Sequence, residues 1–122
     1  LFLDVVARAK RRFRFTVRNF CIMSNHVHLM VRPIGNENLS KIMQWILSVF
    51  ATMFNKLFGL HGHVWYDRFK SRIIESFIQM IATFIYICEN PVRANIVKNA
   101  IDYPFNGIVH IRDGDRTIID SP

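Results

Sequence analysis

The chain has 122 residues, and 51% of them are hydrophobic, which is enough for one domain that buries a core of its own. Its formal net charge of +7 favours anionic partners, so nucleic acid and an anionic membrane surface are the two classes to separate. The longest apolar runs, at about residues 42–54 and 77–88, are far shorter than the roughly 20 residues of a spanning helix, and they favour core helices. The two cysteines stand in no paired spacing, which suggests neither a disulfide framework nor a structural zinc site and favours a reducing cytoplasm.

The first third of the chain predicts a helix followed by two antiparallel strands. The opening residues place apolar side chains at helical spacing and turn strongly basic between residues 8 and 18. Apolar and polar residues then alternate over residues 13–23 with the period of a strand. A serine–asparagine pair predicts a tight turn, and residues 26–31 predict a second strand that ends at Pro33.

The rest of the chain predicts two long helices and one short strand. Residues 39–58 carry apolar side chains in the i, i+3, i+4 pattern of an amphipathic helix, which Gly59 ends. An irregular stretch then leads to a predicted strand at residues 72–76 and a helix at about 77–89, which the Asn90–Pro91 pair ends. Residues 91–97, PVRANIV, are a candidate for a further helical turn. The tail is weakly determined by its sequence. This order of elements predicts an α+β fold, with a small antiparallel or mixed sheet and helices packed on one face.

Two histidines, His26 and His28, stand one residue apart in the second predicted strand. Because side chains alternate along a strand, both rings point to one face, while Val27, Leu29 and Val31 are expected to face the core. Two converging imidazoles suit a divalent metal held on a rigid element. The alternative is that one ring is a hydrogen-bonded core histidine and the other is exposed.

The last predicted helix carries a polar ridge opposite its apolar side. At about 100° per residue, Gln79, Thr83, Tyr86 and Asn90 share one side. Tyr86 and Asn90 are one turn apart, so a hydroxyl and an amide oxygen reach the same place. An amide oxygen is a competent third metal ligand, and a tyrosine can act as a nucleophile. The alternative is that this ridge simply faces water.

Two segments combine positive charge with features that suit nucleic acid. The stretch HGHVWYDRFKSR, residues 61–72, interleaves basic and aromatic side chains, which offers stacking surfaces beside charges for phosphate. The other segment is the basic stretch that begins at residue 8. The alternatives are an ordinary loop packed on a core and a solvated charged face. The candidate DNA-binding residues of the two segments are Arg12, Arg14, Trp65, Arg68, Lys70 and Arg72.

Three stretches, in this order, resemble one known family. MSNHVHLMV resembles the histidine–hydrophobic–histidine strand of the single-tyrosine HUH transposases, in particular the group associated with repetitive extragenic palindromes. HGHVWYDRFKS is similar to that group's Gly-His-aliphatic-Trp and Arg-Phe-Lys-Ser segments, and YICENPVRANIV to its Tyr-Ile-x-x-Asn-Pro-Val-Arg-Ala segment. The three stretches lie within residues 13–105, and together they are far more specific than any one alone.

The resemblance implies a ferredoxin-like sandwich and assigns roles to particular residues. His26 and His28 become metal ligands, Asn90 the third ligand and Tyr86 the nucleophile, and Arg93 in the third stretch becomes a further DNA-binding candidate. The metal implied is Mg²⁺ or Mn²⁺. Members of the family usually open with a strand before the first helix, so we expect the single domain of residues 1–122 to lack that strand. For the two other tyrosines, at positions 66 and 103, no residue one turn away matches the family's metal ligand.

The activity that the resemblance implies is cleavage and joining of single-stranded, hairpin-bearing DNA through a 5′-phosphotyrosine. Two other functions stay open on the residues alone. One is a non-catalytic nucleic-acid-binding module on the same fold, and the other is a metal-dependent hydrolase that uses water. Dimers that share an active site occur in this superfamily, so the resemblance also leaves a homodimer open.

Overall fold

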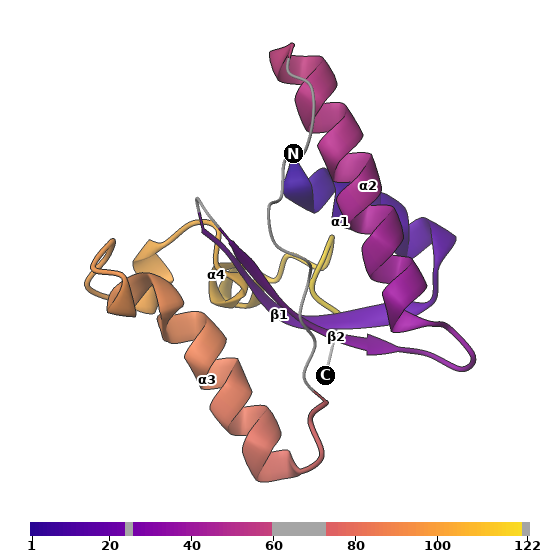
Figure 1. Cartoon of the computed structure of the whole chain (residues 1–122). Helices are drawn as coiled ribbons and strands as arrows, with labels where there is room; N and C mark the ends of the chain where they lie inside the picture. The colour runs from indigo at the N-terminus through magenta and orange to yellow at the C-terminus, as the bar shows by residue number, and fades with distance from the viewer. Residues whose placement is uncertain (24–25, 60–72, 121–122) are drawn as a thin grey trace. The chain divides into compact units, whose positions relative to one another are not determined.

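The computed structural model describes residues 1–23, 26–59 and 73–120. Its helices and strands follow in the order shown in Figure 1: α1 (Phe2–Arg12), β1 (Phe15–Ile22), β2 (Val27–Pro33), α2 (Leu39–Phe58), α3 (Phe77–Arg93), a 3₁₀ helix η1 (Ala100–Asp102) and α4 (Gly107–Asp113). The chain divides into two compact units. The first contains Leu1–Phe15 and α2, and the second contains Thr16–Arg32 and the elements from α3 to α4. Among the described helices, none has the length and hydropathy needed to cross a bilayer.

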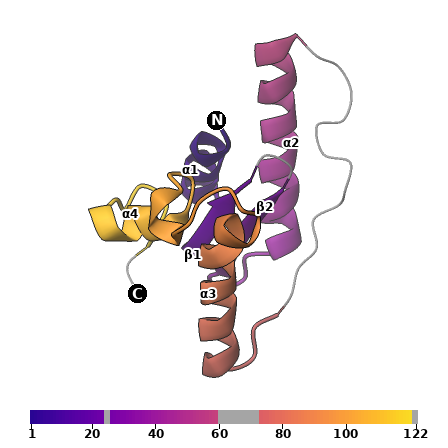
Figure 2. The same cartoon turned by 90° about the vertical axis from the view of Figure 1, so that its left-hand side faces the viewer.

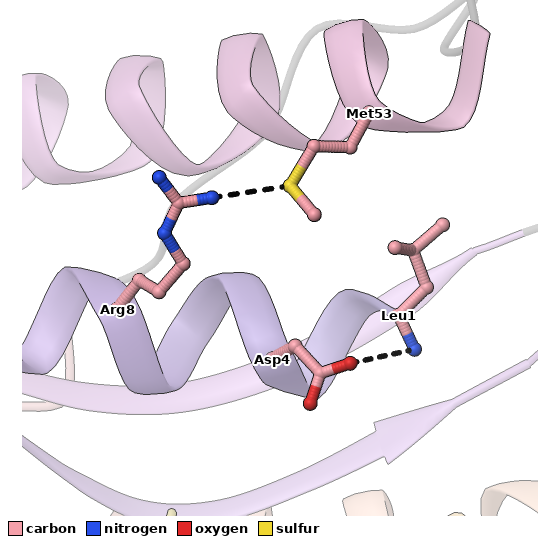
Figure 3. A network of polar contacts seen from close by, with 4 residues as sticks. All are labelled: Leu1, Asp4, Arg8 and Met53. Carbon is pink, nitrogen blue, oxygen red and sulfur yellow. Dashed lines mark hydrogen bonds and ion pairs between the residues drawn. The ribbon is translucent and has the colours of Figure 1, made fainter. Parts of the chain in front are cut away.

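The first unit is built on the packing of α1 against α2. The buried face of α1 includes Phe2, whose ring meets the edge of Phe50 on α2 at a centroid distance of 5.3 Å. At the border of this face the guanidinium of Arg8 donates to the sulfur of Met53 over 3.2 Å, as Figure 3 shows. The predicted first helix is therefore confirmed, with apolar side chains toward α2 and basic residues in its last turn, where they complement the helix dipole.

Helix α2 begins and ends where the sequence predicts. The side chain of Asn38 accepts a hydrogen bond from the backbone amide of Lys41, which satisfies one of the free amides of the first turn. Gly59 ends the helix in the left-handed conformation, at a φ of 65°. Ile42 and Ile46, one turn apart, are almost fully buried.

The hairpin of β1 and β2 is the only sheet among the described residues. Near its turn, the backbone amide of Met23 donates to the carbonyl of His26 over 2.8 Å, so the two strands run antiparallel as predicted. In the second unit, Val17, Asn19 and Cys21 are fully buried at alternate positions of β1. Cys21 and Met23 form a core cluster with Met30 of β2 and Ile87 of α3.

Two expectations for the second half of the chain are wrong, and a third segment, the tail, is described by the structure alone. Residues 73–75 form no strand, and position 72 lies outside the described residues. Helix α3 does not end at Asn90–Pro91 but continues to Arg93, which is the start of the further helical turn considered for residues 91–97; the amide of Ala94 still donates to the carbonyl of Asn90. The tail is ordered by contacts with β1: Val17 and Asp120 exchange two hydrogen bonds.

The fold class is nevertheless the predicted α+β class. Two halves of α3 differ in burial: Phe77 and Ile81 near its start are exposed, whereas Ile87 and Cys88 near its end are buried. In Figure 2 the C-terminal part of α3 lies beside the strands. Asn19 of β1 links the strand to α3, because its side-chain amide donates to the carbonyl of Phe84 over 3.1 Å. The hairpin and the last turns of α3 therefore position the candidate site.

Candidate active site

The two histidines lie at the start of β2 with their rings in contact. The centroids of the His26 and His28 rings are 4.9 Å apart, and the ring planes meet at 84°. The neighbouring residue on the same face is Met30, which is 6% exposed and packs in the core cluster with Ile87 of α3. Val27, Leu29 and Val31 are only half-buried. The expectation that the face opposite the histidines supplies the buried residue of β2 is therefore wrong, because α3 covers the histidine face.

Asn90 approaches His26 from α3. Its side chain is 8% exposed, and its amide nitrogen lies 3.2 Å from Nε2 of His26. Because an amide nitrogen only donates hydrogen bonds, Nε2 accepts here, and a neutral His26 ring then carries its proton on Nδ1. The lone pair of Nε2 therefore points at the Asn90 side chain.

Tyr86 lies one turn before Asn90 and meets the second histidine. The centroids of the Tyr86 and His28 rings are 5.9 Å apart, and their planes are nearly perpendicular, at 89°. Tyr86 is 53% exposed, so the residue is open to solvent. A continuous series of contacts thus joins Asn90, His26, His28 and Tyr86 within one unit of one chain. The polar ridge of α3 lies against the histidines at this end.

Arg93 contacts Tyr86 in two ways that the sequence analysis missed. Its guanidinium carbon lies 3.8 Å from the centroid of the Tyr86 ring, and one of its terminal nitrogens donates to the Tyr86 carbonyl over 3.0 Å. The two residues are seven positions apart, which is two helical turns, so they share one side of α3. The seven-residue spacing could have predicted this contact, but Pro91 predicted that the helix ends before Arg93.

Burial and charge act together on His28. The pKa of His28 is lowered from its ordinary value of 6.5, first because burial disfavours the charged ring and then because of electrostatic interactions with His26 and Arg93. The neutral imidazole is therefore favoured at neutral pH. A neutral ring keeps a nitrogen lone pair available for a metal ion.

The donor set at this place suits a divalent cation. Rotation of the Asn90 amide by 180° exchanges its nitrogen for its oxygen, so an oxygen ligand can face the point that Nε2 of His26 already faces. Two imidazoles and an amide oxygen form a mixed set that Mn²⁺ and related ions accept. In the described part of the chain, no group of three or more His, Cys, Asp and Glu side chains could hold a metal. Asn90, whose side chain meets His26 from α3, is the candidate third protein ligand.

The predicted DNA-binding residues fall in three places. Arg12 and Arg14 are exposed in the first unit, where the guanidinium of Arg12 lies 5.8 Å from the ring centroid of Trp45. Arg93 lies in the second unit on Tyr86. The others are outside the described residues: Trp65, Arg68, Lys70 and Arg72.

The two other tyrosines of the chain differ from Tyr86. Tyr103 packs against the core cluster, and its hydroxyl donates to the carbonyl of Ile22. Burial, followed by the nearby Cys21, raises the pKa of Tyr103 above its ordinary value of 10.0. Tyr66 is outside the described residues.

Comparisons with known proteins concern the family and the fold of the chain. The sequence model of the family described as "Transposase IS200 like" matches residues 2–90. A solved structure of a REP-associated tyrosine transposase bound to a REP hairpin superposes with a TM-score of 0.75 at 24% sequence identity, covering 98% of this chain and 70% of that one. No curated protein sequence matches the chain. The structural likeness concerns the fold, and the roles of the individual site residues stay predictions.

Proposed function

Because the chain belongs to the family of IS200-like transposases, we propose that it nicks and rejoins single-stranded DNA that carries a hairpin, through a covalent bond to Tyr86. The observation that carries this proposal is the series of contacts from Tyr86 through His28 and His26 to Asn90. These contacts support the proposal because the proposed nucleophile lies beside the proposed ligands of a cation. The hairpin substrate is proposed because the structurally similar transposase is bound to a REP hairpin.

The covalent step exchanges one phosphate ester for another. The phenolic oxygen of Tyr86 attacks the phosphorus of a backbone phosphodiester, the bond to the 3′ oxygen breaks, and the DNA 5′ end stays on the tyrosine. The phenol proton passes to water, and the departing 3′ oxygen takes up a proton to become a hydroxyl. The 3′-hydroxyl of another DNA end reverses the step, which rejoins DNA without an external energy source. The half-exposed position of Tyr86 leaves room for a phosphate to reach it.

We further propose that His26, His28 and Asn90 hold Mg²⁺ or Mn²⁺. Such an ion, when bound, would neutralise the negative charge of the scissile phosphate in the transition state. The protein's own contribution is to keep the His28 ring neutral by burial and to aim the Asn90 side chain at His26. Imidazole ligands favour Mn²⁺ over Mg²⁺, so Mn²⁺ is the better probe in experiments.

Affinity for DNA is proposed to come from the positive charge of the chain. The net charge of +7 attracts the phosphate backbone, and Arg12 and Arg14 present exposed guanidinium groups in the first unit. Each phosphate contact releases counterions, so the logarithm of the affinity should fall with the logarithm of the salt concentration by about 0.7 per contact on single strands. The proposed cytoplasmic site of action and a homodimer remain predictions.

The direct test incubates the protein with end-labelled single-stranded DNA carrying a hairpin, in the presence of Mn²⁺. We expect a labelled protein–DNA adduct that survives denaturation, and its loss in Tyr86→Phe. Tyr103→Phe is the matched control, because it removes the hydroxyl of the tyrosine that packs on the core cluster. An adduct that persists in Tyr86→Phe would contradict the proposal. Cleavage without an adduct would instead support a hydrolase, and binding without cleavage would support a non-catalytic module.

A further inference from the structure

Arg93 is fixed to Tyr86 at two points. The flat guanidinium lies over the phenol ring, 3.8 Å from its centroid, and a terminal nitrogen donates to the Tyr86 carbonyl over 3.0 Å. The hydrogen bond to the Tyr86 carbonyl fixes the position of the guanidinium, and the guanidinium limits the orientations open to the Tyr86 ring. A residue engaged in this way differs from a basic side chain that extends freely to solvent.

The local structure of α3 explains why Arg93 reaches this position. Pro91 lies in the last turn, yet the helix continues through it to Arg93. Seven residues after Tyr86, Arg93 returns to the same side of the helix. A carbonyl oxygen has two lone pairs, so the Tyr86 carbonyl can accept a bond from Arg93 beside its bond within the helix. Had the helix ended before Pro91, this contact would not form.

The orientation of the Tyr86 ring depends on its contacts with neighbouring side chains. Its side chain is 53% exposed, and among the described residues no partner hydrogen-bonds its hydroxyl. An exposed tyrosine has several staggered rotamers open to it, and only some of them bring the ring against His28. The ring lies against His28, at a centroid distance of 5.9 Å, in the same arrangement in which Arg93 lies over it.

We propose that Arg93 is a positioning residue for Tyr86, which holds the phenol in the orientation required for attack. The inference rests on the proposed function. It replaces the simpler expectation that Arg93 serves only as a DNA contact. A lysine keeps the charge but loses the planar stacked group and the fixed fork of donors, so Arg93→Lys separates the two roles. Small misplacements of reacting groups cost on the order of 100-fold in rate, which sets the size of the effect to look for.

The test measures two quantities for wild type, Arg93→Lys and Arg93→Ala: DNA affinity by fluorescence anisotropy, and the single-turnover rate of adduct formation at saturating DNA with Mn²⁺. For Arg93→Lys we expect an affinity within about twofold of wild type and an adduct rate lower by roughly 10- to 100-fold. Arg112→Lys is the matched control, since Arg112 is an exposed arginine of α4 that pairs with Asp113. It should change neither quantity.

A chemical rescue distinguishes positioning from a merely structural role. Methylguanidinium, added at a concentration too low to unfold the protein, should restore part of the adduct rate of Arg93→Ala and leave Arg93→Lys unchanged. An adduct rate of Arg93→Lys equal to wild type at saturating DNA would overturn this inference while leaving the proposed function intact. Complete absence of an adduct with the wild-type chain would overturn the proposed function, and this inference with it.

Discussion

The side-chain amide nitrogen of Asn90 lies 3.2 Å from Nε2 of His26, although 64 positions separate the two residues in the sequence. This contact joins the end of α3 to the start of β2. It also brings an amide group and an imidazole lone pair to one point. If a cation binds there, rotation of the Asn90 amide by 180° brings its oxygen to the position of its nitrogen.

Asn90→Ala tests that arrangement without DNA. We expect the affinity for Mn²⁺ to fall on the order of 10- to 100-fold, because the substitution removes one of three proposed protein ligands. Electron paramagnetic resonance measures the free Mn²⁺ ion directly, so the result does not depend on activity. Asn99→Ala is the control, since Asn99 is exposed and its side chain bonds Asp102, away from the proposed ligands. Equal Mn²⁺ affinity in Asn90→Ala and wild type would show that Asn90 is not a ligand.

The lowered pKa of His28 predicts a pH dependence of stability. The unfolded chain binds a proton at this residue near pH 6.5, while the folded chain resists doing so until lower pH. The unfolded state therefore binds more protons in this window, and the free energy of unfolding should fall as the pH drops below about 6.5. Above that pH the contribution is fully present.

Urea unfolding at a series of pH values between about 5 and 7.5, with a chelator present, measures this dependence. His28→Gln keeps a polar side chain without a titrating ring, so its unfolding free energy should fall less steeply toward low pH than that of wild type. Parallel slopes for the two proteins would mean that His28 does not titrate differently in the folded and unfolded states.

The periodic parts of the sequence predicted the fold well. Helix α2 has the predicted bounds because its apolar spacing and Gly59 both indicate them; the Asn38 cap is seen only in the structure. The helical spacing of Tyr86 and Asn90 predicted that they lie together, and the contact with His26 joins them to the hairpin. These features are local or repeat along one element, so they are visible in the sequence.

Other features depend on tertiary contacts that no local pattern shows. Pro91 predicted the end of α3, but the helix continues for two more residues to Arg93, and the amide of Ala94 still donates to the carbonyl of Asn90. The alternation in β2 did not show which face α3 would cover, so the burial of Met30 beside the histidines was not foreseen. The ordered tail depends on hydrogen bonds between Asp120 and Val17, more than 100 positions apart.

Gly107, the first residue of α4, shows how closely the C-terminal segment packs on β1. A Cβ atom at this position would meet the side-chain oxygen of Asn19 and lie 2.9 Å from the backbone nitrogen of Phe20. Gly107→Ala should therefore lower the free energy of unfolding by about 1–3 kcal/mol through overpacking. Urea unfolding curves measure this change.

Gly114→Ala provides the comparison. Gly114 has a φ of +69°, and nothing lies within 4 Å of a Cβ placed there, so the cost is conformational only and should be about 1 kcal/mol or less. A loss of stability in Gly114→Ala larger than in Gly107→Ala would contradict the close approach of α4 and β1.

The contact between Tyr86 and His28 lies within one chain, which predicts a site complete in cis. Mixing two inactive proteins, Tyr86→Phe and His28→Ala, should then restore no adduct. In a dimer that exchanges the tyrosine helix, the mixture would recover adduct on the chain that retains Tyr86. Such recovery, measured with one chain carrying a larger tag, would show that two chains share the site.

Identification of the residue that carries the DNA is the most direct measurement of the central claim. The adduct formed with Mn²⁺ and hairpin-bearing single-stranded DNA is digested with nuclease and protease, and the peptide that retains a nucleotide is sequenced by mass spectrometry. We predict that the nucleotide is attached to Tyr86, in the peptide that also contains the start of the ENPVR segment. A nucleotide on Tyr66 or Tyr103 would contradict the account of the site that begins with His26 and His28.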